Sequence, residues 1–277
     1  MKKRGMDVPA YKDMFSRNAA FQQFETLKRN REKRTHQRLF FLEGVHPIEQ
    51  AIAAGYEFYA IGCDAEERLS GWANDMIRRA NPEIVYRMAH ALRQELSDRE
   101  NPCELVCLVR MRPELKTIDA PDALYTVFDR PSSPGNLGTV IRSADAFGCR
   151  SVLTTGHGAD LYDPQCIRAS IGTLFHVSHA ALGSCDEALK FLDALPERPL
   201  VLGTSAHGTV NIDEVDLTGP VALIIGNETF GLSKAWKERC DVLARIPIFG
   251  AASSLNVGCA TSICLYEIAR QRANGKK

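Results

Sequence analysis

The chain has 277 residues, of which 45% are hydrophobic and 25% charged, and its formal net charge is zero. These values are ordinary for a globular protein with a core. Its nine cysteines are odd in number and contain no C-x-x-C pair, which argues against a disulfide framework and a zinc site. No apolar stretch has the length of a signal peptide or a membrane span, so we expect a soluble, cytoplasmic protein with no membrane association.

The zero net charge hides a basic N-terminus. Residues 1–40 carry eleven Lys and Arg against four Asp and Glu. Such an arm favours a polyanionic partner, because each phosphate that it neutralises releases condensed counterions. A solvated, partly helical tail is the alternative. The basic residues in question are Lys28, Arg29, Arg31, Lys33, Arg34 and Arg38.

The first half of the chain predicts an extension followed by a small domain. Residues 1–35 are polar and basic, with aromatic residues at helical spacing. Residues 36–112 alternate between strand and helix patterns: a strand and a helix within 39–55, a strand over 57–63, helices near 66–80 and 90–98, and a β-rich run over 103–111. Residues 113–122 have no periodicity and read as a linker.

The pattern restarts in residues 123–277. We predict strands over 124–129, 151–155, 174–180, 200–204 and 221–226, and helices over 136–148, 164–170, 186–194 and 233–239, followed by a helix in the second half of 246–272. Several of the strands are apolar throughout. Strands of this kind alternating with helices indicate an α/β domain whose parallel sheet is covered on both faces.

Three strand–loop–helix junctions carry the polar residues of this second domain. They contain NLGTVIRSADAFG (136–148), IIGNETFGLS (224–233) and IPIFGAASSLNVGCATSICLYE (246–267). Junctions at the carboxyl ends of parallel strands are where α/β proteins bind ligands. Neither a phosphate-binding P-loop nor a G-x-G-x-x-G dinucleotide fingerprint occurs, which disfavours a nicotinamide enzyme. His176 and His179 fall on opposite faces of the predicted strand, so no metal site is expected.

These three segments resemble the three motifs of the SpoU family of RNA 2′-O-ribose methyltransferases, in the SPOUT class. RASIGTLFHV (168–177) matches the segment between the first two motifs, and residues beginning RLFFLEGVHPIEQAIAAG (38–55) resemble the L30e-like, ribosomal-protein-like RNA-binding domain that many members carry. The resemblance implies a catalytic domain at 123–277 with a C-terminal trefoil knot. It also implies S-adenosylmethionine (AdoMet) as the cofactor, RNA as the partner and a homodimer built through the catalytic domain.

The resemblance implies roles for individual residues. Arg142 would lie beside the target ribose, where a guanidinium stabilises phosphate and alkoxide rather than acting as a base. The positions that match the family's other catalytic residues are Asn136, Glu228, Ser254 and Asn256. Those that match its cofactor loops are Thr204, Gly226, Asn227, Ile246 and Leu255.

Two positions depart from the family's common pattern. Thr229 stands where Gly often follows the motif-two glutamate, and Gly258 stands where Ser is common in motif three. Ribosomal RNA is the favoured substrate, because the front domain is similar to that of rRNA enzymes. The alternatives are a tRNA 2′-O-methyltransferase, base methylation by another branch of the class, or a non-catalytic RNA-binding or ribosome-assembly protein on the same fold.

Overall fold

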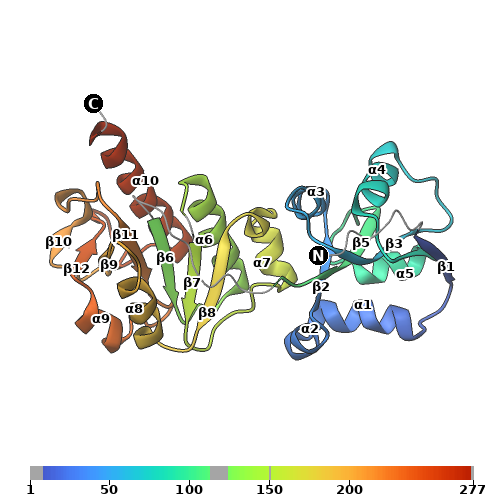
Figure 1. Cartoon of the computed structure of the whole chain (residues 1–277), viewed down its shortest axis with the longest axis horizontal. Helices are drawn as coiled ribbons and strands as arrows, with labels where there is room; N and C mark the ends of the chain where they lie inside the picture. The colour runs from blue at the N-terminus through green and yellow to red at the C-terminus, as the bar shows by residue number, and fades with distance from the viewer. Residues whose placement is uncertain (1–8, 113–123, 150, 276–277) are drawn as a thin grey trace. The chain divides into compact units, whose positions relative to one another are not determined.

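The computed structural model describes residues 9–112, 124–149 and 151–275. The chain divides into two compact units (Figure 1). The first comprises Met1–Arg112 with the short segment Tyr162–Arg168, and the second comprises Pro113–Leu161 and Ala169–Lys277. In the part of the chain that the structure describes, no helix is long and apolar enough to cross a membrane.

The first unit contains a five-stranded mixed sheet with the order β1-β4-β3-β5-β2. Strand β5 runs antiparallel to β2 and β3, whereas β4 runs parallel to β1 and β3. The strands are β1 (Ala10–Met14), β2 (Leu39–Glu43), β3 (Phe58–Asp64), β4 (Ile84–Met88) and β5 (Leu105–Arg110).

Helices cover both faces of this sheet. The core on one face joins Phe21, Phe24 and Leu27 of α1 and Leu96 of α5 to alternate residues of the strands. Helices α3 and α4 lie on the opposite side of the sheet (Figure 1). The helices are α1 (Ala19–Arg29), α2 (Arg31–Gln37), α3 (Val45–Ala53), α4 (Gly71–Ala80), α5 (His90–Leu96) and, from the second half of the chain, α7 (Pro164–Ala169).

Two asparagines position α1 and α2. Asn18 accepts a hydrogen bond from the backbone N–H of Phe21 (3.1 Å) at the start of α1. Asn30 ends α1, and its side chain accepts from the N–H of Lys33 (3.0 Å) at the start of α2. Asparagine is favoured at helix N-caps because it satisfies an N–H group that lacks an intrahelical partner. Together with β1, these helices make residues 10–37 part of the first unit, where we had expected a separate extension.

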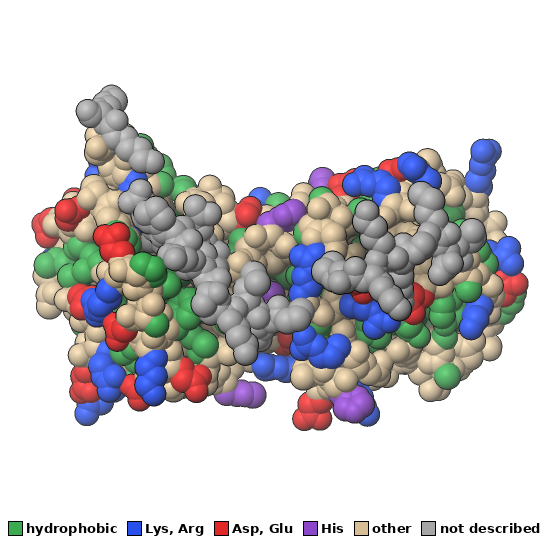
Figure 2. All heavy atoms as spheres, in the orientation of Figure 1, with side chains coloured by type: hydrophobic (Ala, Val, Ile, Leu, Met, Phe, Trp, Pro, Cys, Tyr) green, Lys and Arg blue, Asp and Glu red, His purple; other side chains and the backbone are tan. Residues whose placement is uncertain are grey.

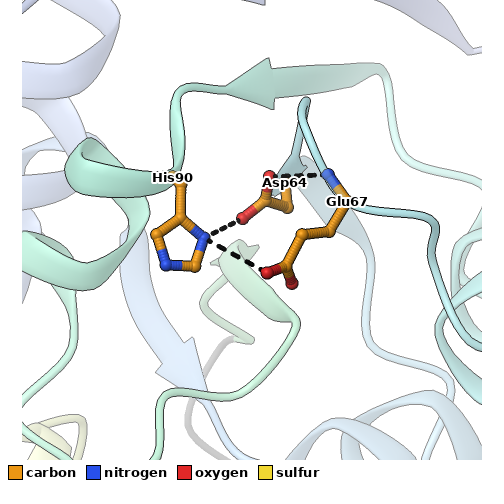
Figure 3. Close-up of side chains that lie close together, drawn as sticks. All are labelled: Asp64, Glu67 and His90. Atoms are coloured by element: carbon orange, nitrogen blue, oxygen red, sulfur yellow. Dashed lines mark hydrogen bonds and ion pairs between the residues drawn. The ribbon is translucent and has the colours of Figure 1, made fainter.

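A network around Asp64 joins the end of β3 to the start of α5 (Figure 3). The buried Asp64 carboxylate accepts hydrogen bonds from the N–H groups of Glu66 (2.8 Å) and Glu67 (3.1 Å) and from Arg93 Nε (3.2 Å), and lies 2.7 Å from His90 Nδ1. Burial raises the pKa of Asp64, but these hydrogen bonds outweigh it and the net pKa is lowered. Asp64, Glu67 and His90 could group around a cation, yet the same Oδ2 already faces both Arg93 and His90. We therefore interpret the group as a structural cross-link.

Replacing Asp64→Asn should lower the free energy of unfolding by about 3 kcal/mol, because Arg93 would stay buried without its counter-charge. Urea unfolding measures the change. The matched control is Asp75→Asn, which removes only exposed ion pairs with Arg78 and Arg79 and should cost less than about 1 kcal/mol. Equal effects of the two substitutions would contradict a structural role for the Asp64 network.

The second unit contains a seven-stranded sheet with the order β10-β12-β9-β11-β6-β7-β8, in which every strand pair is parallel. The central strands β6 and β11 are buried along their whole length, as expected of a sheet covered on both faces. The strands are β6 (Leu124–Asp129), β7 (Ser151–Thr155), β8 (Ser178–Leu182), β9 (Leu200–Thr204), β10 (Val210–Asn211), β11 (Val221–Ile225) and β12 (Val242–Arg245).

Helices α6 and α10 pack together, and the core beneath α8 and α9 includes Ala188, Leu192 and Trp236. The predicted α/β class with its parallel catalytic sheet is confirmed. The elements are α6 (Pro134–Ala146), α8 (Cys185–Asp193), α9 (Lys234–Arg239) and α10 (Val257–Gly275), with short 3-10 turns at Thr173–Phe175 and Ile212–Glu214.

The strand predicted over 174–180 is wrong in its first half. Gly172 adopts a left-handed conformation (φ 87°) and starts a 3-10 turn at Thr173–Phe175, so the strand begins only at Ser178. Leu174 and Phe175 are apolar because they are buried in that turn. An apolar run of this length does not distinguish a buried turn from a buried strand.

Candidate active site

The loop after β6 leads into α6 through a serine cap. Ser133 accepts a hydrogen bond from the N–H of Asn136 (3.3 Å), and Pro134 is the first helical residue. Proline suits that position because its fixed φ is helical and it has no N–H to satisfy. Asn136 therefore lies inside the first turn of α6 and does not cap it, so its side chain can bond to other loops.

Glu228, from the loop after β11, holds this first turn in place. Its carboxylate accepts from the N–H of Ser132 (2.9 Å), the hydroxyl of Ser132 (2.6 Å), the N–H of Ser133 (2.9 Å) and Nδ2 of Asn136 (3.3 Å). Burial raises the pKa of Glu228, but these hydrogen bonds outweigh it and lower the pKa overall. The carboxylate is thus favoured as an anion that orders a loop, and its oxygens are occupied by donors rather than by an arginine.

Asn256 extends the same chain of hydrogen bonds to α10. Its Nδ2 donates to Oδ1 of Asn136 (3.2 Å), while its own Oδ1 accepts from the N–H groups of Gly258 (2.9 Å) and Cys259 (3.4 Å) at the helix start. The direction of the chain is set by Glu228, because an ionised carboxylate only accepts and so turns the Asn136 amide nitrogen toward itself. Glu228, Asn136 and Asn256 therefore connect all three motif loops.

Asn227 shapes the motif-two loop into a tight turn. Its Oδ1 accepts from the N–H groups of Thr229 (2.9 Å) and Phe230 (3.1 Å), and its Nδ2 donates to the carbonyl of Arg130 (2.7 Å). Its backbone pairs with that of Gly231 in both directions. Asn227 is thus a structural organiser of the turn, and the side chain of Thr229 lies exposed beside it.

Gly226 is required where the turn closes on itself. A Cβ at this position would lie 2.3 Å from the backbone carbon of Gly231 and 2.3 Å from the nitrogen of Leu232. Any larger residue would push the two sides of the loop apart.

Gly258 is explained by its neighbour on α6. A Cβ at position 258 would lie 2.6 Å from Cγ2 of Thr139, and the Thr139 hydroxyl donates to the carbonyl of Gly135 (3.0 Å). The threonine side chain therefore occupies the space in which a serine at position 258 would sit. This departure from the family pattern has a local packing cause, and sequence spacing alone did not indicate it.

The motif-three loop borders a cavity of about 620 Å³ within the second unit. This volume is typical of small-molecule sites. Of the residues predicted to contact the cofactor, Ile246 lines it. Thr204 is the last residue of β9, and Gly226 follows the neighbouring strand β11. Leu255 and Ser254 lie exposed in the same loop. The lining consists of Ala206, Asn211, Asp213, Arg245, Ile246, Pro247, Ile248, Phe249, Ala252 and Ser253.

Among the described residues, Arg142 makes no hydrogen bond or ion pair with Glu228, Asn136 or Asn256. It lies on α6 six positions after Asn136, which corresponds to about 9 Å along the helix. Its neighbour Ser143 contacts Ser262 of α10 (2.7 Å between the hydroxyl oxygens). Arg142 itself is exposed, and among the described residues it has no ion-pair partner.

The predicted basic residues of the N-terminus have different environments. Lys28 is buried and forms an ion pair with Asp98 (2.7 Å), and the buried Arg34 donates to the carbonyls of Leu27 (2.9 Å) and Lys28 (3.0 Å). Because both side chains are paired inside the first unit, we do not propose Lys28 and Arg34 as RNA-binding residues. In the face drawn in Figure 2, Lys and Arg side chains lie among Asp and Glu rather than in one patch. The exposed members of the predicted set are Arg29, Arg31, Lys33 and Arg38.

Fold and site together define an α/β protein with ligand loops at the carboxyl ends of its parallel strands. The family model described as the SpoU rRNA Methylase family matches residues 123–266, and that of the SpoU L30e-like domain matches residues 18–107. The chain belongs to the SpoU rRNA methylase family.

Individual relatives agree with this assignment. The chain is 42% identical over 279 residues to a 23S rRNA (uridine(2479)-2′-O)-methyltransferase of Streptomyces viridochromogenes, covering 99% of this chain and 97% of that protein. Among solved structures, the SpoU methyltransferase AviRb of that organism, in complex with AdoMet, superimposes with a TM-score of 0.88 at 40% identity, covering 93% and 99% of the two chains. An AdoMet-bound rRNA methyltransferase of Sinorhizobium meliloti gives a TM-score of 0.84 at 27% identity, covering 94% and 98%.

Gly258→Ser should lower the free energy of unfolding by about 1–3 kcal/mol, because the added atoms overpack the contact with Thr139. Rotation of the threonine would break its bond to Gly135, and β-branched side chains in helices have few other rotamers. Combining G258S with Thr139→Ala should recover most of the loss. Urea unfolding of both variants, with T139A alone as the control, measures this. An additive double variant would contradict the proposed packing.

Glu228→Gln should lower the free energy of unfolding at neutral pH by about 1–3 kcal/mol, because the new amide group faces the N–H donors of Ser132 and Ser133. The pKa of Glu228 is lowered on folding, so its contribution is present above the unfolded-state pKa near 4.3 and is lost as the pH falls through the folded-state value. The difference between wild type and variant should therefore shrink with acidification below about pH 4. A difference that is independent of pH in this range would contradict the role of the charge.

Proposed function

We propose that this protein transfers the methyl group of AdoMet to a ribose 2′-hydroxyl of ribosomal RNA. The observation that carries the proposal is the Glu228–Asn136–Asn256 chain of hydrogen bonds, which fixes the three motif loops against one another beside the cavity at Ile246. Methyl transfer requires the methyl donor and the hydroxyl to be held in line. Loops that are cross-linked in this way supply the necessary rigidity.

The residues around the cavity fit AdoMet. Six of the ten lining side chains are apolar, and the lining includes Asp213 and Arg245, so a ligand with an apolar body and both charges finds matching partners. The cofactor supplies a sulfonium-activated methyl group. We assign Thr204, Gly226, Ile246 and Leu255 to its binding, largely through their backbone groups, and Asn227 to holding the loop that contains Gly226. The trefoil knot that the family assignment implies would bring these loops together.

The remaining polar residues serve the RNA side. A guanidinium stays protonated at all physiological pH values, so Arg142 would stabilise the ribose oxygen as it loses its proton and would bind the adjacent phosphate. Glu228 is unsuited to act as the base, because four hydrogen-bond donors already occupy its carboxylate. Asn136, Ser254 and Asn256 would order the substrate edge of the site.

We further propose a homodimer in which Arg142 of one copy completes the site of the other. Arg142 makes no hydrogen bond with the three linked residues of its own chain and lies six positions after Asn136 on α6. Helix α10 also exposes the apolar side chains of Ile263 (40%) and Tyr266 (57%), the latter in edge contact with Phe147. Exposed apolar side chains of this kind on a helix suit a contact between copies.

Among ribosomal RNAs we propose 23S rRNA as the substrate. The relative from Streptomyces viridochromogenes, which this chain matches over nearly its whole length, is a 23S rRNA methyltransferase. Arg29, Arg31, Lys33 and Arg38 would hold its phosphates without reading sequence. With a ribosomal substrate, the protein would act in the cytoplasm. Methyl transfer from labelled AdoMet to rRNA, with tRNA assayed in parallel, tests the reaction and the substrate. Methylation of tRNA alone would overturn the choice of rRNA, and the absence of methyl transfer to either RNA would overturn the proposed function.

Arg142→Ala should lower methyl transfer by about 100-fold or more while AdoMet affinity stays near that of wild type, because the guanidinium acts on the developing oxyanion. The activity assay and isothermal titration measure the two effects. The matched control is Arg239→Ala, which removes only a surface ion pair with Asp186 and should leave activity unchanged. Parallel loss of activity and cofactor affinity would contradict the assigned role.

Mixing subunits tests whether Arg142 acts across the dimer. If R142A subunits are exchanged with Asn256→Ala subunits, a heterodimer has one site with both residues intact, provided that each site takes Arg142 from the other copy. About a quarter of wild-type activity is then the expected maximum, because half of the dimers are mixed and each has one good site. If the mixture of R142A and N256A subunits stays inactive after exchange, Arg142 acts in the site of its own chain.

A further inference from the structure

Phe230 lies at the tip of the motif-two turn with 76% of its surface exposed. A phenylalanine left in water forgoes the stabilisation that burial of its ring would provide. Its flanking residues, Thr229 and Gly231, are exposed too and offer no apolar neighbours. Within the turn Asn227–Gly231, Phe230 is therefore the single apolar side chain.

The turn presents this ring in a fixed position. The backbone N–H of Phe230 donates to Oδ1 of Asn227 (3.1 Å), and Asn227 and Gly231 exchange two backbone hydrogen bonds (3.0 and 2.9 Å). The Asn227 side chain is anchored in turn to the carbonyl of Arg130 (2.7 Å). The ring thus projects from a held backbone, and a contact with its faces would need little further ordering of the turn.

The location of the turn connects Phe230 to the reaction. Glu228, two residues before it, binds the first turn of α6 through Ser132, Ser133 and Asn136. Cationic groups are close in the structure or in the chain. Arg130 donates from Nη2 to the carbonyl of Gly231 (3.3 Å) and to the carboxylate of Asp129 (3.0 Å). The side chain of Lys234 is 88% exposed and lies 3.6 Å from the carboxylate of Glu238. Each cation has further N–H donors that these contacts do not use.

We propose that Phe230 stacks on an unpaired base of the RNA beside the methylated ribose, with Arg130 and Lys234 toward the neighbouring phosphates. The inference rests on the proposed function. Proteins that act on single-stranded RNA combine exposed aromatic rings with cations in this way, because every base has a π-face and every nucleotide a charge. A second copy of the chain fits less well, since interface cores are depleted of charged residues and the charged residues Glu228, Arg130 and Lys234 belong to this turn or lie next to it.

Three substitutions separate stacking from simple apolar contact. Phe230→Ala should weaken binding of an rRNA fragment, and kcat/KM for it, by about 10-fold or more, as loss of one stacked base does. Phe230→Leu keeps an apolar side chain but loses the flat ring, and should resemble F230A. Phe230→Trp should retain at least wild-type affinity. Thr229→Ala, in the same turn, is the matched control and should change neither quantity.

Each result that would contradict the stacking proposal points to a different role for Phe230. If F230L binds RNA as wild type does, the ring acts by apolar contact and stacking is overturned. If F230A alters the mass of the protein in solution, the ring belongs to a contact between copies; if F230A weakens AdoMet binding in isothermal titration, it belongs to the cofactor site. RNA affinity is measured by filter binding without turnover. A wild type that binds RNA but does not methylate it would therefore refute the proposed function and still leave the stacking proposal decided by the variants.

Discussion

The hydrogen bonds that converge on the Glu228 carboxylate hold the catalytic unit's loops in their working arrangement. They tie the loop after β11 to the first turn of α6, and through Asn136 and Asn256 they reach the start of α10. Partial burial of a carboxylate costs free energy unless hydrogen-bond donors compensate for the lost water. Four donors contact the Glu228 carboxylate. Three segments far apart in the chain thereby become one surface.

The residues of the site fall into two groups: those whose polar groups are bonded within the protein, and those whose side chains are exposed. Glu228, Asn136, Asn227 and Asn256 have their polar groups engaged with the protein and act through geometry. The side chains of Arg142 and Phe230 are exposed, and Arg142 has no ion-pair partner among the described residues, so they suit contacts with RNA or, for Arg142, with the site of a second copy. The cavity at Ile246 lies beside the third loop, where small residues leave room for a ligand.

The first unit shows why charge in a sequence is an incomplete guide to an RNA-binding surface. Lys28 and Arg34 belong to the same basic run as Arg31 and Lys33, yet α1 and α2 turn the first two inward, where carbonyls and Asp98 satisfy them. A helix distributes neighbouring residues around its axis, so a run of six basic side chains cannot share one face. Which of them meet water depends on what the helix packs against.

The sequence by itself determined the family, the α/β class, most element positions and the polar residues of the three motif loops, because apolar periodicity and motif order are local properties. It missed β1, β4, β10 and β12, whose exposed or mixed patterns resemble loops, and it misread the turn at Gly172 as a strand. Only the tertiary structure decided that Glu228 binds the first turn of α6, that Asn256 reaches Asn136, and that Thr139 accounts for Gly258. Those facts depend on which segments lie within a few ångströms of one another, and contacts between distant segments are not encoded at any fixed sequence spacing.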